Sequence, residues 1–398
     1  MKQQQKTWQG SSTKRRNSAF FLFVFLGMLS AFAPFVTDMY LPSLPAMTHY
    51  FGVGVSLVQL GLTFSILGLA AGQIVFGPLS DKYGRKLPLV VSLILFLLAT
   101  VGCIMAPNIQ TFIILRFAQG IAAAGGIVIS RSIATDKFKG RNLAVALAIV
   151  GAINGVAPVV APVIGGAILK VTSWRGVFAV LFVWGLLLTA ASAHFRESLS
   201  AKRRAKAPLA KAFSLFKPLF SNRIYILCTL QTAFAEALLF SYISASPFII
   251  QQHYGFSPFA FSLFFAANAV ALAGGSAIAV KFKRLETGML ASCAGMLFFG
   301  ALTFAALVAN ASVVVFEILL ALMLASLGIT FTVSTTLAMD AARDRAGTAS
   351  ALFGASCFLF GAAATPLVGL GNILTSTGIA FVVCAALSLM CGLIALKR

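Results

Sequence analysis

The chain has 398 residues, of which 60% are hydrophobic and 10% are charged, and its net charge is +21. A composition this apolar excludes a soluble globular domain. Long apolar stretches recur along the chain, and the loops between them are short. Because about 20 apolar residues cross a bilayer, we predict a membrane protein with twelve spans. The predicted spans are residues 19–41, 54–78, 87–106, 109–134, 142–168, 174–194, 224–250, 259–280, 288–308, 313–336, 348–370 and 375–396.

Most of the positive charge lies in the N-terminal segment and in every second loop, whereas the other loops hold only Lys170 and Arg175. This distribution follows the positive-inside rule, so we predict that both termini are cytoplasmic. The topology signal accounts for nearly all of the charge, and we expect no nucleic-acid partner. The basic start could instead belong to a signal peptide. However, the first apolar run is too long, contains Asp38 and precedes eleven more spans, so we interpret it as a retained helix.

The segment 195–223 is the one long polar connection, and it separates six predicted spans from six others. An offset of 204 residues aligns Asp136 with Asp340 and Pro162 with Pro366, at matching points of the two halves. Two related halves of this kind place a substrate site between them near the middle of the membrane. The predicted organisation is a tail (1–18), a six-helix bundle (19–194), a basic cytoplasmic linker (195–223) and a second six-helix bundle (224–396).

Asp38 is the most informative residue of the first predicted span. It interrupts the otherwise uncharged run 18–50 and opens the segment Asp38-Met39-Tyr40-Leu41-Pro42. An unpaired carboxylate near the middle of a span costs roughly 2.5–3.5 kcal/mol on insertion scales. Binding a proton is the cheapest way to reduce that cost. We therefore predict that Asp38 takes up and releases a proton within the membrane and that Tyr40 lies beside it at the substrate site.

The second predicted span is followed by the sequence Gly-Pro-Leu-Ser-Asp-Lys-Tyr-Gly-Arg-Lys over residues 77–86. Glycines allow a tight turn. Asp81 can accept hydrogen bonds from a helix N-terminus, and Arg85 can bind a carboxylate. A plain amphipathic turn would not need this whole set of residues, so we predict a tight cytoplasmic turn after the second span.

The fourth predicted span carries Arg116 and, one turn later, Gln119. At 1.5 Å per residue, Asp38 lies about 5 Å below Pro42, and Arg116 lies about 10 Å deep from the same side. Because these levels are similar, we predict that Asp38 and Arg116 are close neighbours and that protonation loosens their ion pair. The alternative is a fixed structural ion pair. Gln119 would line the same substrate site.

Small residues and prolines recur at helical spacing in several spans. In the second span the stripe is Gly61, Ser65, Gly68 and Gly72, and a similar stripe occurs in the eighth. Such faces let helices approach closely, either at moving interfaces or in ordinary packing within one bundle. The prolines of the fifth span also remove backbone hydrogen bonds and bend the helix. Its stripe consists of Gly151, Gly155, Pro158, Pro162, Gly165 and Gly166.

The second half offers further candidate site residues. Glu236 lies near the middle of the seventh span and is the second candidate for binding protons or a cationic substrate; a neutral acid hydrogen-bonded inside the bundle is the alternative. Glu317 is a weaker candidate. Asn154 and Asn268 provide hydrogen bonds at the centre or join helices, and Phe240 and Phe264 would form walls of a drug pocket.

Cysteine and histidine spacing supports neither a metal site nor an enzyme. The six cysteines are scattered through apolar spans without a C-x-x-C pair. His49, His194 and His253 lie at loops and span ends, with no nucleophile–base pair or phosphate-binding loop. No cofactor is predicted, and there is no room for the soluble output domain of a receptor.

The 77–86 sequence resembles the signature turn of the major facilitator superfamily. Residues 38–42, Arg116-Phe117-Ala118-Gln119-Gly120 and Ala157-Pro158-Val159-Val160-Ala161-Pro162 resemble, more narrowly, the bicyclomycin/chloramphenicol resistance (Bcr/CflA) drug:proton antiporters. The resemblance covers nearly the whole chain. It implies twelve helices, alternating access, and a monomer in the bacterial inner (cytoplasmic) membrane that exports small amphipathic drugs in exchange for protons.

The resemblance also implies residue roles. A conformational-switch motif would be formed by Gly77, Asp81, Gly84, Arg85, Lys86 and Asp136. Within it, Asp81 would cap the eleventh helix across the bundles and Arg85 would pair with Asp136. The fifth span would be the antiporter-motif helix. The second half departs from the pattern, because Lys281-Phe282-Lys283-Arg284 replaces the repeated turn. Some relatives have a second acid where this chain has Ser30, so a two-acid relay within the first helix is not expected.

We therefore predict a secondary active transporter and not an enzyme. The predicted function is proton-coupled multidrug efflux of compounds such as chloramphenicol or bicyclomycin, with protons and small-molecule drugs as partners. The alternative on the same fold is a proton-coupled transporter of a sugar, an amino-acid-derived compound or a peptide-like metabolite. That transporter would need a more polar and more selective pocket.

Overall fold

The computed structural model describes residues 18–138, 153, 156–201, 204, 217–342 and 346–396, and their regular structure is helical. Within these ranges, eleven helices are long and apolar enough to cross a membrane, and Val156–Ile168 is a shorter apolar helix. The described part of the chain thus confirms the predicted all-α membrane fold. Most of the predicted fifth span before Val156 lies outside the described residues, as do Gly151, Asn154 and Gly155.

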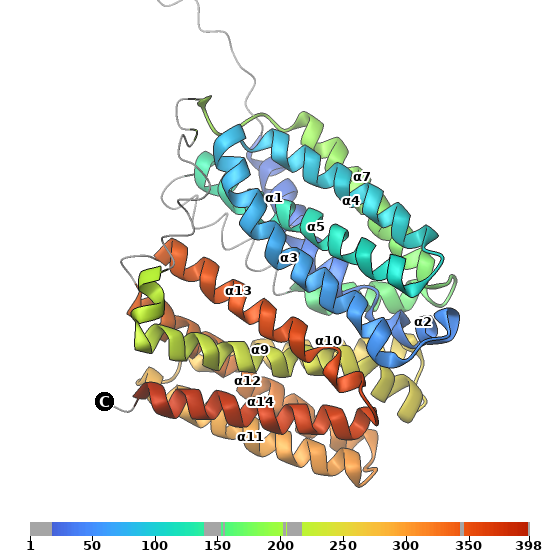
Figure 1. The fold of residues 1–398 in the computed structure, drawn as a ribbon, viewed down its shortest axis with the longest axis vertical. Coiled ribbons are helices and arrows are strands. Elements are labelled where there is room, and N and C mark those ends of the chain that lie inside the picture. Colours follow the sequence, from blue (N-terminus) through green and yellow to red (C-terminus); the bar gives the residue numbers. More distant parts are fainter. Residues whose placement is uncertain are drawn as a thin grey trace, which may run out of the picture.

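The helices form two groups that follow the order of the chain (Figure 1). The first group contains α1 (Ala19–Asp38), η1 (Leu41–Ser43), α2 (Leu44–Phe51), α3 (Val55–Tyr83), α4 (Lys86–Met105), α5 (Ile109–Lys137), Val156–Ile168 and α7 (Trp174–His194). The second group contains η3 (Lys217–Ser221), α9 (Arg223–Phe248), η4 (Ile249–His253), α10 (Pro258–Ala279), α11 (Leu285–Val308), α12 (Val313–Ala341), α13 (Ala346–Ala364), η6 (Leu367–Gly369) and α14 (Ile373–Leu396). We call these groups the first and second bundles.

Side-chain caps start several of the long helices. The oxygen of Ser18 accepts from a backbone N–H in the first turn of α1, and Asn108, Asn222, Ser257 and Ser312 do the same for α5, α9, α10 and α12. Each cap satisfies one of the N–H groups that a helix leaves unpaired at its start. The polar residue before each apolar run is therefore a physical start signal, and the observed starts lie close to the predicted ones.

Three helices continue beyond the predicted end of their apolar span. Helices α3, α5 and α12 each contain 29 residues and end at Tyr83, Lys137 and Ala341. Hydropathy marks only the apolar part of a helix, whereas its backbone hydrogen bonds continue into polar residues. As a result Gly77 lies inside α3, and only Gly84, with a φ of 94°, forms the predicted turn.

Glycines bring two helix pairs into backbone contact. A Cβ atom at Gly68 or Gly120 would collide with a carbonyl oxygen of the other helix in the α3–α5 pair, and Gly275 and Gly328 have the same relation in the α10–α12 pair. Small residues allow such close approach. The Gly68 stripe therefore packs α3 against α5 within the first bundle, which is one of the two alternatives considered for it.

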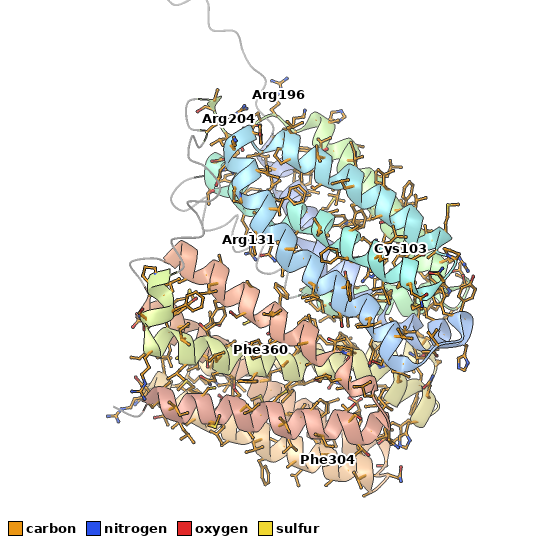
Figure 2. All side chains as sticks on the ribbon, viewed as in Figure 1. Cys103, Arg131, Arg196, Arg204, Phe304 and Phe360 are labelled. Atoms are coloured by element: carbon orange, nitrogen blue, oxygen red, sulfur yellow. The ribbon has the colours of Figure 1, made fainter. Side chains whose placement is uncertain are left out.

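The two bundles contact each other at the end of the molecule that carries Pro42 and α2, which we call the Pro42 end. The opposite end, where Arg85 and residues 195–201 lie, is called the linker end; Arg131, Arg196 and Arg204 lie toward it and Cys103 lies toward the Pro42 end (Figure 2). Among the described residues, the hydrogen bonds between the bundles are Gln251 Nε2 to Pro42 O (3.0 Å), Gln59 Nε2 to Ser244 O (3.1 Å) and Ser56 Oγ to Pro366 O (2.9 Å). These bonds close the Pro42 end.

Candidate functional site

A cavity of about 230 Å³ lies between the two bundles. Helices α1, α3 and Val156–Ile168 form one side, and α9, α10, α12 and α13 form the other. Its lining is mostly aliphatic and aromatic, and among the described residues Asp38 is the only charged side chain in it. The polar side chains that accompany Asp38 in the wall are Thr37, Tyr242 and Asn268. An apolar pocket with a few polar groups is the usual form of a small-molecule site.

Asp38 reaches the cavity because of its position on α1. It is the last residue of that helix, and Pro34, one turn earlier on the same face, also lines the cavity. The side chain is 7% exposed. Among the residues that the structure describes, no lysine or arginine lies within ion-pair distance of it. The cavity therefore holds a carboxyl group without a neighbouring cation.

The predicted ion pair between Asp38 and Arg116 is absent, and this prediction is wrong for this structure. Arg116 is fully buried, donates from Nη2 to the carbonyl oxygen of Val36 (3.0 Å) and lies over the ring of Tyr40, 4.3 Å from its centre. Val36 and Tyr40 are four residues apart and share one face of the chain, whereas Asp38 lies about 200° around the helix from Val36. Asp38 and Arg116 are therefore at similar levels, but the Asp38 side chain points away from the side of α1 that contacts Arg116.

Arg116 belongs instead to a buried polar group inside the first bundle. It also donates to Oε1 of Gln119, whose Nε2 donates to Oγ1 of Thr100 (2.7 Å). Within the described residues, Nε of Arg116 and the hydroxyl of Tyr40 have no hydrogen-bond partner. Tyr40 and Gln119, both predicted to contact substrate, do not line the cavity.

In the second bundle, two of the predicted substrate contacts line the cavity and one does not. Phe240 and Asn268 are in the wall. Phe264 packs against Phe256, with ring centres 5.3 Å apart, and the next residue, Phe265, faces the cavity in its place. Successive side chains of a helix point about 100° apart. The prediction of Phe264 was therefore one residue away from the wall residue Phe265, but it chose the wrong face of α10.

Two acids of the second bundle lie near the cavity without lining it. Glu236 of α9 is partly buried, lies one turn from Phe240 on the same face and is within electrostatic range of Cys357 on α13. Glu317 of α12 accepts a hydrogen bond of 2.7 Å from Nδ2 of Asn268. The structure therefore connects Glu317 to the cavity wall, although Glu236 was the stronger candidate from the sequence.

The described part of the fifth span approaches both bundles. Pro158 lines the cavity and Pro162 is buried. At Gly165, a Cβ atom would collide with the carbonyl oxygen of Met39, and at Gly166 with Ser262 of α10. These two glycines therefore let the helix pack closely against the end of α1 and against the second bundle.

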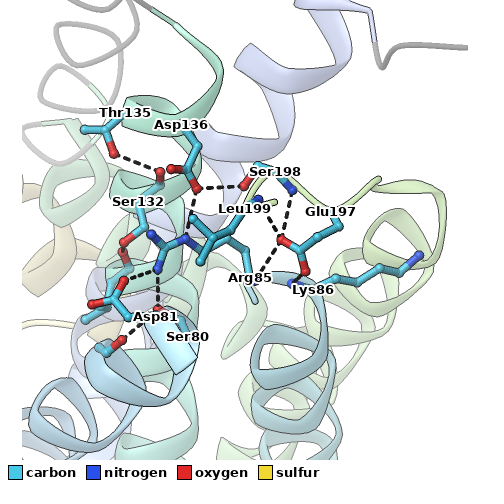
Figure 3. Close-up of polar contacts among 12 residues, drawn as sticks. Ser80, Asp81, Arg85, Lys86, Ser132, Thr135, Asp136, Glu197, Ser198 and Leu199 are labelled. Carbon is cyan, nitrogen blue, oxygen red and sulfur yellow. Dashed lines mark hydrogen bonds and ion pairs between the residues drawn. The ribbon is translucent and has the colours of Figure 1, made fainter. Parts of the chain in front are cut away.

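The predicted switch residues form a network of ion pairs and hydrogen bonds at the linker end (Figure 3). Arg85 is 7% exposed, binds Oδ2 of Asp136 through Nε (2.9 Å) and contacts Asp81 and Ser80 through Nη1. The expected pair between Arg85 and Asp136 is thus present. Burial alone would lower the pKa of Arg85, but hydrogen bonds to Asp136 and Asp81 more than offset it, so the pKa is raised.

The proposed contact between Asp81 and the eleventh helix, α13, stays a prediction. The ion-pair partner found for Asp81 is Arg85 in its own bundle, and the Asp81 side chain is 55% exposed. Residues 343–345, which precede α13, lie outside the described residues. This ion pair with Arg85 connects Asp81 to its own bundle.

Glu197 is a member of this network that the sequence analysis missed. Its carboxylate accepts hydrogen bonds from the backbone N–H groups of Arg85 (2.9 Å), Lys86 (3.2 Å), Ser198 (2.9 Å) and Leu199 (2.9 Å) (Figure 3). The first two lie at the start of α4, where a carboxylate is favoured by the helix dipole. A Cβ at Gly84 would collide with this carboxylate. The sequence contained one indication of this role, because Glu197 is the only acid in residues 195–223.

Two further observations bear on the chemistry of the molecule. Lys86 donates from Nζ to the carbonyl oxygen of Ala193 (2.8 Å), which ties the start of α4 to the end of α7. Within the described ranges, no group of three or more histidine, cysteine, aspartate or glutamate side chains is placed to hold a metal ion.

Two helical bundles around a shared, mostly apolar cavity define a multi-pass membrane transporter. The family model described as Major Facilitator Superfamily matches residues 21–366, and the chain belongs to this superfamily. Over 354 residues it is 36% identical to a protein of Bacillus subtilis (strain 168) named "Uncharacterized MFS-type transporter YdgK", covering 87% of this chain and 88% of the relative.

Two other relatives carry names that refer to drug resistance. A "Bicyclomycin resistance protein homolog" of Haemophilus influenzae is 30% identical over 67% of this chain and 68% of its own length. A "Chloramphenicol resistance protein" of Pseudomonas aeruginosa is 30% identical over 59% of this chain and 55% of its own. These similarities place the chain among transporters with drug-resistance relatives.

Solved structures show the same fold. An inward-open form of the xylose transporter XylE from E. coli matches with a TM-score of 0.74 and 13% identity, covering 95% of this chain and 96% of that one. An inward-facing, unoccupied bacterial homolog of the lysosomal transporter Spinster matches with a TM-score of 0.73 and 17% identity, covering 96% and 99%. At these identities the likeness concerns the fold.

Proposed function

We propose that this chain exports small amphipathic drugs across the cytoplasmic membrane of a bacterium in exchange for protons. The single observation that carries the proposal is Asp38, a buried carboxyl group in a mostly apolar cavity between the two bundles, with no lysine or arginine of the described residues within ion-pair distance. Burying an unpaired charge costs far more than burying a neutral group. Proton binding at Asp38 is therefore linked to what else occupies the cavity.

Competition between proton and drug would couple their movements. A drug in the cavity, especially a cationic one, favours the ionised carboxylate, and a proton on Asp38 disfavours the drug. Such coupling is reciprocal, so each ligand weakens binding of the other. Glu236 lies one turn beyond the cavity on α9 and would contribute as a second proton-binding group. Arg116 would assist by holding α1 through the Val36 carbonyl.

Alternating access requires that the two ends of the molecule open in turn. In this structure the Pro42 end is closed by the three hydrogen bonds between the bundles. We propose that the linker end faces the cytoplasm and that the Arg85 network holds the first bundle rigid while the bundles rock. Names of the relatives support drug export.

The lining of the cavity argues against the alternative of sugar or metabolite transport. A sugar needs many hydrogen-bond partners, and in the described part of the wall only Thr37, Asp38, Tyr242 and Asn268 have polar side chains. The rest of the described wall is apolar. Amphipathic compounds bury their apolar surface in such a pocket and need few polar contacts.

The test is drug accumulation in a drug-sensitive bacterium that expresses the wild-type chain or Asp38→Asn. We expect the wild type to lower accumulation of chloramphenicol and of a fluorescent lipophilic cation, and a protonophore to abolish this effect. Asp38→Asn should accumulate drug like cells without the chain. Glu286→Gln, which removes an exposed acid at the start of α11, is the matched control and should behave as wild type. Export that persists in Asp38→Asn, or that ignores the protonophore, would contradict the proposal.

A further inference from the structure

Glu317 lies behind the cavity wall and communicates with the cavity through one side chain. Asn268 is 3% exposed, lines the cavity and donates its Nδ2 to Oε2 of Glu317 at 2.7 Å. On α12, Glu317 precedes the wall residue Leu324 by seven residues, so the two lie on the same face of the helix. Glu317 therefore points toward the cavity side of α12, nearer the Pro42 end than Leu324.

Tyr242 lies in the cavity wall near Asn268. Its side chain is 4% exposed, lines the cavity and stacks on Phe265, with ring centres 5.6 Å apart. Its hydroxyl lies toward Asn268 but has no hydrogen-bond partner of normal geometry among the described residues. A buried hydroxyl without a partner costs free energy. The wall thus offers an unused polar group beside the amide that Glu317 holds.

From these contacts we propose that Glu317 is a further proton-linked acid of this cavity, acting through Asn268, and that the cavity takes a lipophilic cation between Asp38 and the Asn268–Glu317 pair. The proposal deepens the drug-export function and rests on it. It makes Glu317 a positioning residue, because its contact with the cavity is through the amide.

The protonation state of Glu317 determines which end of the Asn268 amide faces the cavity. An ionised Glu317 only accepts hydrogen bonds, so it holds the Nδ2 group of Asn268 and leaves Oδ1 free to accept from Tyr242 or from a cargo. A protonated Glu317 can donate to Oδ1, and the amide then presents its donor group toward the cavity. A cation in the cavity favours the first arrangement through the negative charge of Glu317, and proton uptake favours the second.

The surroundings of Glu317 contain no lysine or arginine at ion-pair distance within the described residues. The titratable groups that interact with it are Tyr242 of α9 and Tyr254 after η4, whose hydroxyl donates to the carbonyl oxygen of Ala311 (3.1 Å). Other titratable groups on the packed helices lie nearer the linker end or across the cavity; among them are Tyr225, Cys228 and Glu236 of α9, Glu286 and Cys293 of α11, Asp340 of α12, Cys357 of α13 and Asp38 of α1. His253 of η4 is exposed, and its ring packs against that of Tyr254.

The experiment is equilibrium binding of tetraphenylphosphonium to the purified full-length protein over a series of pH values. Below its pKa, each acid that must lose its proton before the cation binds makes Kd fall about tenfold per pH unit as the pH rises. It therefore adds about one to the magnitude of the slope of log Kd against pH, and the slopes compared below are magnitudes. We expect Glu317→Gln to lower the wild-type slope by about one in the pH range where the acid is protonated in the free protein. The Glu286→Gln control should keep the wild-type slope.

A second variant, Asn268→Ala, distinguishes a loss of proton linkage from a loss of folding. Asn268→Ala keeps the acid but removes its connection to the cavity, so it should also lower the slope, while Glu317→Asp should keep the wild-type slope. A wild-type slope in both Glu317→Gln and Asn268→Ala would overturn the inference. If Asp38→Asn lowers the slope and Glu317→Gln does not, this inference fails and the drug-export proposal stands. Absence of cation binding by the wild type overturns the inference, whereas the accumulation assay tests drug export independently.

Discussion

The molecule buries acids in two contrasting places. At the linker end, Asp136 is 9% exposed and pairs with Arg85, which also binds Asp81. At the cavity, Asp38 is similarly buried but has no lysine or arginine within ion-pair distance among the described residues. A paired carboxylate has one favoured charge state and holds structure. An unpaired one exchanges its proton with the surroundings, which is what a coupled transporter needs.

The strongest test of this contrast is Asp38→Asn. It should reduce drug export to the level of cells without the chain, because the variant can no longer exchange a proton. The free energy of unfolding should be unchanged or higher, since an unpaired buried acid is replaced by a neutral amide. Drug accumulation and denaturant unfolding in lipid bicelles measure the two effects. Loss of both stability and export would place Asp38 among the structural acids.

Arg85→Met should show the opposite pattern. Removing the cation takes Arg85 away from the buried Asp136, which keeps the hydrogen bond from Ser198, and breaking a buried pair costs about 3–5 kcal/mol at most. We expect a decrease of up to that size in the free energy of unfolding, followed by lower amounts of protein in the membrane. The double variant Arg85→Met with Asp136→Leu should recover part of the loss, because it also removes the carboxylate that has lost its arginine. Equal stability of the wild type and Arg85→Met would show that the network does not hold the bundle.

Glu197→Gln tests whether the linker stabilises the start of α4. The variant keeps the shape of the side chain but removes the charge that accepts four backbone hydrogen bonds. Hydrogen bonds to charged groups are the stronger ones, so we expect a loss of about 1–2 kcal/mol, reduced by the partial exposure of the site. Hydrogen exchange at the N–H groups of Arg85 and Lys86 should become faster. Unchanged exchange at both would exclude the capping role.

Asp81→Asn should have the smallest effect on stability. Asp81 also binds Arg85, but its side chain is 55% exposed. Exposed ion pairs contribute less than about 1 kcal/mol. Asp81 and Asp136 bind the same arginine but differ in burial. Comparing the loss of unfolding free energy in Asp81→Asn with that in Asp136→Asn therefore measures the effect of burial. A larger loss at Asp81 than at Asp136 would reverse this order.

Much of the fold follows from the sequence. Hydropathy located the eleven long apolar helices, and residues such as Ser18 and Asn108 marked where helices start. The pair Arg85–Asp136 was expected from the resemblance and is present. In the site, the level of Asp38 and Arg116 was predicted, but their contact was not found. Phe264 was expected at the cavity, and Phe265 occupies the wall.

These errors share one physical cause. Counting 1.5 Å per residue places a side chain along the helix axis, but the direction in which it points depends on how the helix is rotated against its neighbours. Small residues such as Gly68 and Gly120 set that rotation through backbone contacts between helices distant in sequence. The contacts of Glu197 and Glu317 have the same origin, because each joins segments that the chain order keeps apart.

Composition and hydropathy thus establish that the chain crosses a membrane many times and where its helices run, because those properties depend on local sequence and the thickness of a bilayer. Packing establishes the rest: that Arg116 faces Tyr40 and not Asp38, that Glu317 reaches the cavity through Asn268, and that Glu197 caps α4. Each of these contacts needs two helices to meet at one rotation, and no stretch of sequence read in isolation contains that angle.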